Sequence, residues 1–115
     1  AASDVYKRQM QRLLRETTPA EAYFCGDDVL SIGALSAIRD HGLRVPEDIG
    51  LIGVNDMRMS GWQNINLTTI AQPFAEIIQT SIDVIVDMLQ APKQPAQAQR
   101  LPCRLVERGT LRALP

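Results

Sequence analysis

Carboxylate side chains follow two short apolar stretches of the chain, and their types and spacing suit ligand binding. Asp27 and Asp28 follow the first stretch, and Asn55 and Asp56 follow the second. If both stretches are parallel strands of one sheet, ligands are expected just outside their carboxyl ends. The sequence therefore predicts a binding site at the edge of the sheet where these polar residues gather.

The residues expected near this edge suit a ligand with several hydroxyl groups, because each ionised carboxylate accepts two or more charge-assisted hydrogen bonds. Gln72 adds an amide that both donates and accepts. Trp62, the only tryptophan, has an aromatic face that suits the C–H face of a sugar ring. Two other roles stay open for Trp62, which are capping the core and facing a partner subunit. Together these residues predict a carbohydrate pocket.

Catalytic constellations are weak in this sequence. Asp27, Asp28 and Asp56 supply the hard oxygen ligands that Mg²⁺ prefers, so a metal-dependent enzyme is one alternative. The chain lacks the Gly-x-Ser-x-Gly elbow of a nucleophilic hydrolase, and His41, its only histidine, falls at the wrong end of its expected helix. No glycine-rich phosphate loop follows a strand. We therefore expect no enzyme activity, no metal and no cofactor.

A βαβ unit is predicted to position these residues. It consists of a strand over 22–25, a helix over 29–41 and a buried strand over 49–54. Asp27 or Asp28 is the expected N-cap of the helix, and Gly42 the expected C′ residue. The inward stripe of the helix is Leu30, Ala34, Ala37 and Ile38, with Gly33 allowing close approach to the sheet.

The flanking sequence predicts further elements of an α/β fold. Residues 10–16 are expected to close a helix with Leu13 and Leu14 inward, and a short strand is expected over 67–71. Pro73 begins an amphipathic helix that runs to Gln90 and is expected to pack on a sheet. An exposed connector over 91–99 and a last strand over 101–106 complete the chain.

Composition indicates one ordinary globular domain of 115 residues, with 45% apolar and 22% charged residues. The net charge of −1 argues against a nucleic-acid-binding patch within this chain. No apolar run approaches the roughly 20 residues of a membrane span, and no signal peptide is recognisable. Cys25 and Cys103 are expected to be buried thiols, which favours a reducing cytoplasm.

The first nine residues are expected to be a non-native leader. The run Asp4-Val5-Tyr6-Lys7-Arg8-Gln9 resembles the conceptual translation of a transposon end used in sequencing libraries. On that interpretation the natural sequence begins near Met10.

Several ordered motifs resemble the C-terminal part of the LacI/GalR family of bacterial transcriptional regulators. They are Phe24-Cys25-Gly26-Asp27-Asp28, the run from His41 to Ile49 with its Gly-Leu-Arg-Val-Pro-Glu-Asp core, Gly53-Val54-Asn55-Asp56, Leu67-Thr68-Thr69-Ile70 with Gln72-Pro73, and Leu105-Val106-Glu107-Arg108-Gly109-Thr110. The resemblance covers about Met10 to Arg112.

The resemblance implies a partial periplasmic-binding-protein-like fold, a three-layer α/β sandwich with a mainly parallel sheet. In that family two subdomains close on a small effector, commonly a sugar, and a dimer changes its affinity for operator DNA. Residues 10–115 would form the C-terminal part of the effector-binding domain. Within them, the helix over 73–90 would belong to the first subdomain.

The resemblance also suggests ligand contacts. Asp28 matches the family's effector-binding aspartate, Gln72 matches a position that often faces the ligand, and Trp62 falls in a loop that often lines the pocket. Two positions depart from the family, since Asp27 replaces the usual Asn and Asn55 replaces the first Asp of a pair. Both remain candidate contacts.

The family's helix-turn-helix headpiece is absent from this sequence, so operator DNA would be bound only through that missing part. The alternative function is a sugar-binding protein of a transport system, which shares the fold.

Overall fold

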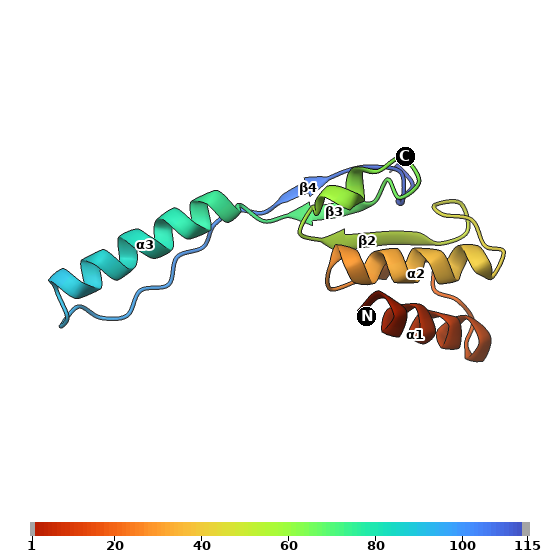
Figure 1. Cartoon of the computed structure of the whole chain (residues 1–115), viewed down its shortest axis with the longest axis horizontal. Coiled ribbons are helices and arrows are strands. Elements are labelled where there is room, and N and C mark those ends of the chain that lie inside the picture. The colour runs from red at the N-terminus through yellow and green to blue at the C-terminus, as the bar shows by residue number, and fades with distance from the viewer. Residues whose placement is uncertain (1, 114–115) are drawn as a thin grey trace. The chain divides into compact units, whose positions relative to one another are not determined.

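The structure, a computed structural model, describes residues 2–113, which form two compact units. Unit 1 contains the residues up to Ala71 and those from Leu105 onward, and unit 2 contains Gln72–Arg104. The elements in chain order are α1 (Ala2–Glu16), β1 (Ala22–Phe24), α2 (Asp28–Asp40), β2 (Gly50–Val54), the 3-10 helix η1 (Arg58–Gly61), β3 (Thr68–Ala71), α3 (Phe74–Gln90) and β4 (Arg104–Val106) (Figure 1).

The sheet has the strand order β1-β2-β3-β4. β1 pairs in parallel with β2, and β2 pairs in parallel with β3, with Ile52 opposite both Phe24 and Thr68. β4 runs in the opposite direction beside β3 (Figure 1). The predicted α/β class with a mainly parallel sheet is therefore confirmed. The strands themselves are slightly shorter than the sequence predicts, most of all the last one.

The helix α2 begins and ends as its sequence predicts. Asp27 is the N-cap, with extended backbone angles, and its carboxylate accepts the Leu30 N–H at 2.9 Å. At the other end His41 is the C-cap, and Gly42 has a φ of 80°, which glycine adopts without strain. Ala34, Ala37 and Ile38 are buried as expected.

The first helix covers α2. α1 ends at Glu16, where residues 10–16 were expected to close a helix, and it begins at Ala2. It lies against α2, while α2 also contacts β2. This two-sided coverage accounts for the burial of Leu35, which lies outside the predicted stripe. Gly33 approaches α1 and not the sheet, because a Cβ there would collide with the backbone oxygen of Ser3.

The buried face of α1 also differs in part from the prediction. Leu14 is in the core with Met10, but Leu13 is 42% exposed. At 3.6 residues per turn, Met10 and Leu14 share one face of a helix and Leu13 lies to its side.

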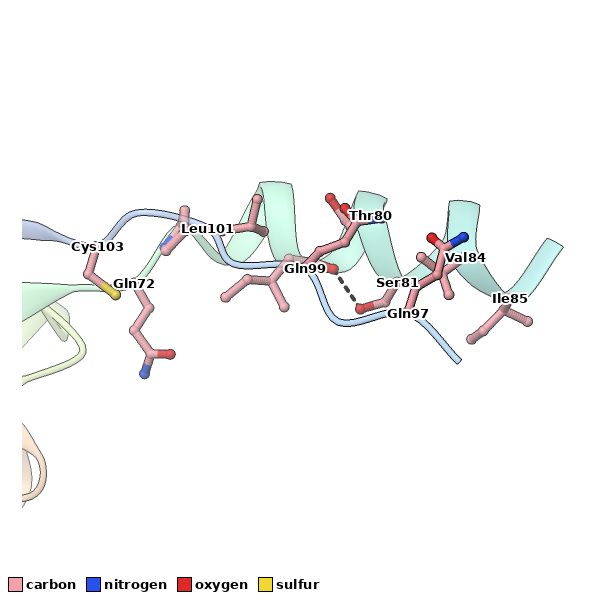
Figure 2. A pocket seen from close by; sticks show the side chains of 11 residues that line it. Gln72, Thr80, Ser81, Val84, Ile85, Gln97, Gln99, Leu101 and Cys103 are labelled. Atoms are coloured by element: carbon pink, nitrogen blue, oxygen red, sulfur yellow. Dashed lines mark hydrogen bonds between the residues drawn. The ribbon is translucent and has the colours of Figure 1, made fainter. Parts of the chain in front are cut away.

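Unit 2 consists of α3 and the segment that returns from it. Pro73 precedes the helix as predicted, and the connector over 91–99 has no helix or strand. The expectation that this helix packs on a sheet is not met within the described residues, since no residue of α3 is buried. A cavity of about 460 Å³ lies between the helix and residues 97–103 (Figure 2).

No helix in the described part of the chain is long and apolar enough to cross a membrane.

Candidate functional site

The carboxyl ends of β1 and β2 bring Asp27 and Asn55 to the same edge of the sheet. The parallel pairing continues past both strands, because the Cys25 N–H donates to Ile52 O at 2.9 Å and the Asn55 N–H donates to Ile70 O at 2.7 Å. Ligands of parallel sheets bind at such edges. The structure therefore places two of the predicted contacts at the expected location.

Asp27 combines a structural role with partial exposure. Its Oδ1 caps α2, and its backbone oxygen accepts both the N–H and the Oγ of Ser31. The cap engages one carboxylate oxygen, and the side chain is only partly buried. A half-buried carboxylate at a helix N-terminus is well placed to accept hydrogen bonds from a ligand.

Asp28 is completely buried, which does not fit its predicted contact with a ligand. Its Oδ2 accepts the Met57 N–H at 2.7 Å and Ser60 Oγ at 2.5 Å, and its Oδ1 accepts Thr69 Oγ1 at 2.6 Å. Three donors satisfy a carboxylate without a ligand. In this structure Asp28 holds η1 and β3 in place behind the edge.

Gly53 makes the burial of Asp28 possible. A Cβ at this glycine would collide with Asp28 Oδ1 and would lie 2.7 Å from Ser31 Oγ. An isolated glycine inside a strand often marks the close approach of another group. Gly53 was therefore the signal in the sequence that could have predicted a buried Asp28.

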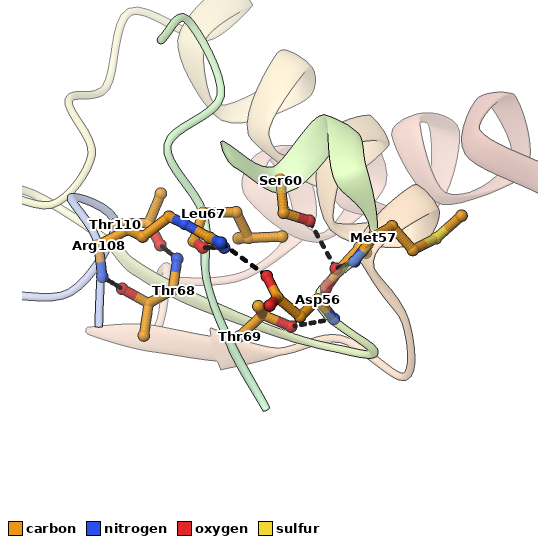
Figure 3. Close-up of polar contacts among 9 residues, drawn as sticks. Asp56, Met57, Ser60, Leu67, Thr68, Thr69, Arg108 and Thr110 are labelled. Atoms are coloured by element: carbon orange, nitrogen blue, oxygen red, sulfur yellow. Dashed lines mark hydrogen bonds and ion pairs between the residues drawn. The ribbon is translucent and has the colours of Figure 1, made fainter. Parts of the chain in front are cut away.

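The turn after β2 has an unusual backbone. Asn55 has a φ of 107° and Asp56 a φ of 51°, a region that costs non-glycine residues about 1–3 kcal/mol each unless the surroundings hold them there. The Asp56 carboxylate forms an ion pair with Arg108, with 2.6 Å between Oδ1 and Nη2 (Figure 3). Sequence reasoning did not identify Arg108, which is 52 positions away.

The segment after β4 completes the hydrogen bonds around this turn. Arg108 Nη1 donates to Leu67 O at 2.9 Å, and the Arg108 N–H donates to Thr68 Oγ1 at 2.9 Å. Thr110 Oγ1 accepts the Thr68 N–H at 2.9 Å (Figure 3). It also donates to Leu51 O at 2.6 Å. The closing Arg-Gly-Thr sequence thus has a structural function.

Trp62 is 57% exposed, so it does not cap the core. It follows η1, the helix that Ser60 attaches to the buried Asp28. An exposed aromatic ring on an anchored loop can contact a ligand or a partner, and both of these roles remain predictions.

Gln72 is the first residue of unit 2 and lines the cavity beside α3. The other lining residues are Pro73, Ile77, Thr80, Ser81, Val84, Ile85, Gln97, Gln99, Leu101 and Cys103 (Figure 2). None of them is charged at neutral pH. The role of Gln72 in ligand binding stays a prediction.

The carboxylates of the metal-site alternative each have a protein partner. Among residues 2–113 no group of three or more His, Cys, Asp or Glu side chains could hold a metal ion. Each of these three carboxylates accepts from a protein donor. Asp27 accepts a backbone N–H, Asp28 accepts three donors, and Asp56 pairs with a guanidinium.

The two cysteines differ. Cys25 is buried beside the edge, and both desolvation and the nearby charge of Asp27 raise its pKa, so its thiol stays protonated at neutral pH. Cys103 is exposed, contrary to the prediction, because it lies just before β4 in unit 2.

Comparisons with known proteins agree on one family. The model of the periplasmic binding protein-like domain matches residues 1–111. The HTH-type transcriptional repressor CytR of Escherichia coli (strain K12) is 38% identical over 108 residues, which are 94% of this chain and 32% of that protein. The repressor PurR of Escherichia fergusonii is 37% identical over 104 residues, 90% of this chain and 30% of that protein. The chain thus spans about a third of these relatives.

Solved structures give the same result. The Lac repressor dimer bound to operator and the anti-inducer ONPF matches with a TM-score of 0.85 and 34% identity over 96% of this chain and 33% of that one. A LacI family transcriptional regulator from Enterococcus faecium with bound ribose matches with a TM-score of 0.77 and 30% identity, over 95% and 40% of the two chains. The predicted resemblance and the predicted fold are confirmed.

Proposed function

The chain belongs to the family of periplasmic binding protein-like domains, and from this premise we propose that it is the effector-sensing part of a LacI/GalR-type transcriptional regulator. The observation that carries the proposal is the sheet edge with Asp27 and Asn55, in a chain 38% identical to a transcriptional repressor. The names of the relatives favour a regulator over the sugar-binding protein of a transport system, and over an enzyme.

The proposed effector is a sugar or a sugar derivative. A carboxylate and an amide at one edge together accept and donate hydrogen bonds, as a ring with several hydroxyls requires. Trp62 would contact a C–H face of that ring. A relative with bound ribose supports this class of ligand. Asp28 acts indirectly, through the loop that it anchors.

The regulatory partners follow from the same family. The regulator would work as a homodimer in the cytoplasm and would contact operator DNA through a headpiece outside these 115 residues. An effector changes DNA binding only if its affinity differs between the two states of the protein. A regulator of this kind needs no cofactor and no membrane contact.

The apolar surface of α3 supports the assignment of 73–90 to the first subdomain. Several large side chains of this helix are at least half exposed, including Ile78, Ile82, Ile85 and Leu89. They recur at intervals of three and four residues, which places them along one stripe. An apolar stripe of this kind is normally covered, and in our proposal the first subdomain of the complete regulator covers it.

Two conservative variants test the proposed contacts. Asn55→Gly removes the amide but tolerates the positive φ. Asp27→Ser removes the carboxylate but keeps an N-cap oxygen. Gln63→Ala, an exposed amide in the same loop, is the matched control.

The complete gene product would be titrated with sugars and sugar phosphates, and its melting temperature recorded. A sugar present at 100 times its dissociation constant should stabilise the protein by about 2.7 kcal/mol. We expect each test variant to lose this stabilisation and Gln63→Ala to keep it. The proposal fails if no sugar stabilises the protein, or if both test variants respond like the control.

A further inference from the structure

The side chain of Arg108 connects the segment after β4 to the turn at the candidate site. Its guanidinium contacts the Asp56 carboxylate at 2.6 Å and the backbone oxygen of Leu67 at 2.9 Å. The side chains of Arg108 and Asp56 are only 21% and 25% exposed. A largely buried guanidinium that donates to two acceptors holds both of them in a defined geometry.

This pair holds the Asp56 carboxylate. The Asp56 N–H makes a long hydrogen bond of 3.4 Å to Thr69 Oγ1, whereas the ion pair with Arg108 is 2.6 Å long. Asn55 precedes Asp56, and both residues have positive φ. Residues in this conformation must be held by their surroundings. The ion pair of Asp56 with Arg108 is one of these contacts, beside the bonds of the Asn55 N–H to Ile70 O and of the Met57 N–H to Asp28, both 2.7 Å long.

Arg108 is itself fixed by its neighbours. Its N–H donates to Thr68 Oγ1 at 2.9 Å, and the next N–H, of Gly109, donates to Asn66 O at 2.9 Å. A Cβ at Gly109 would collide with the amide of Asn66, so the two segments touch at this point. The guanidinium therefore extends from a backbone that is hydrogen bonded to residues 66 and 68.

We propose that Arg108 is a positioning residue of the effector site, which acts through Asp56 to set the conformation of the Asn55–Asp56 turn and thereby the affinity for the effector. Only the second part of this inference, the effect on effector affinity, rests on the proposed function. Its first part concerns the turn and is independent of any ligand.

The test compares Arg108→Met and Asp56→Asn with Arg112→Met in the complete gene product. Arg112 is an exposed arginine of the same segment and serves as the control. Hydrogen exchange would be measured at the amides of Asn55, Asp56 and Met57, with the amides of α2 as the internal reference. Binding of D-ribose, the sugar bound in one relative, would be measured by calorimetry.

We expect both test variants to speed exchange at the three turn amides while the α2 amides keep their rates, and to weaken D-ribose binding about tenfold, which corresponds to about 1.4 kcal/mol. The double variant should be no worse than either single one, because both changes break the same interaction. Arg108→Lys should recover part of the affinity.

Unchanged exchange at the turn, or faster exchange at the turn and α2 together, would overturn the inference, since the latter reports a loss of global stability alone. Faster exchange at the turn with unaltered affinity would overturn the second part. If the unmodified protein binds neither D-ribose nor any other sugar, the proposed function fails, and the exchange rates still decide the role of Arg108.

Discussion

Replacing Asp28 by Ala should lower the free energy of unfolding of unit 1 by about 2–4.5 kcal/mol. The carboxylate accepts hydrogen bonds from Met57, Ser60 and Thr69, and hydrogen bonds to a charged group contribute about 1.5–3 kcal/mol each. We discount their sum by about half, because the two hydroxyls can rotate to other acceptors and Met57 is only partly buried.

Asp28→Asn should be much milder, at about 1–2 kcal/mol. The amide oxygen can keep the bonds from Met57 and Ser60, and the amide nitrogen can donate to Thr69 Oγ1 after that hydroxyl rotates. Only the assistance of the charge is lost. The matched control is Asp40→Ala, whose carboxylate forms a largely exposed ion pair with Lys7 and should contribute less than about 1 kcal/mol.

Urea denaturation followed by circular dichroism gives these free energies, and the fluorescence of Trp62 reports on the loop that Asp28 anchors. An Asp28→Ala variant within about 0.5 kcal/mol of the Asp40→Ala control would refute the hydrogen-bond reasoning. If Asp28→Ala and Asp28→Asn lose the same free energy of unfolding, the charge of Asp28, and not the number of hydrogen bonds it accepts, stabilises this site.

Three further predictions follow from single side chains. The pKa of Asp48 is lowered by hydrogen bonds from the side chain and backbone of Arg44. The contribution of this carboxylate to stability is therefore present above pH 3.8 and is lost as the pH falls below that value. When stability is measured against pH, Asp48→Asn should make the curve flatter in this acid range. A thiol reagent should modify exposed Cys103 in the native protein but reach Cys25 only in denaturant, and native modification of both would contradict the burial of Cys25. Leu89→Gln, at a site 76% exposed, should change the stability of the 115-residue chain by less than about 0.5 kcal/mol in urea denaturation, whereas a loss above 1 kcal/mol would mean that α3 is covered.

Local signals predicted the fold well. The caps of α2 depend on residues next to the helix, namely Asp27 and Gly42, and such signals are readable from sequence. The order of strands and helices followed from the alternation of apolar stretches. The end of α1 at Glu16 agrees with the prediction, while residues 2–9, which were expected to be a non-native leader, form the first turns of this helix.

The site was predicted only in part, because its geometry depends on contacts distant in sequence. A polar residue at a strand end is expected to be accessible, yet Asp28 is buried by donors from two later segments. The ion pair between Asp56 and Arg108 likewise requires the chain to return after unit 2. Periodicity carries no information on such pairs.

The return of the chain also affects how unit 1 folds. Thr110 is hydrogen bonded to Leu51 across 59 positions, and both residues are buried. Bonds between such distant positions form late, because the loop between them must first lose its conformational entropy. During synthesis on the ribosome, the outer edge of β3 would likewise wait for β4 until the whole of unit 2 and residues 105–106 had been made. Until then the outer backbone edge of β3 is open to pairing with other chains, so aggregation of nascent protein competes with folding at this strand.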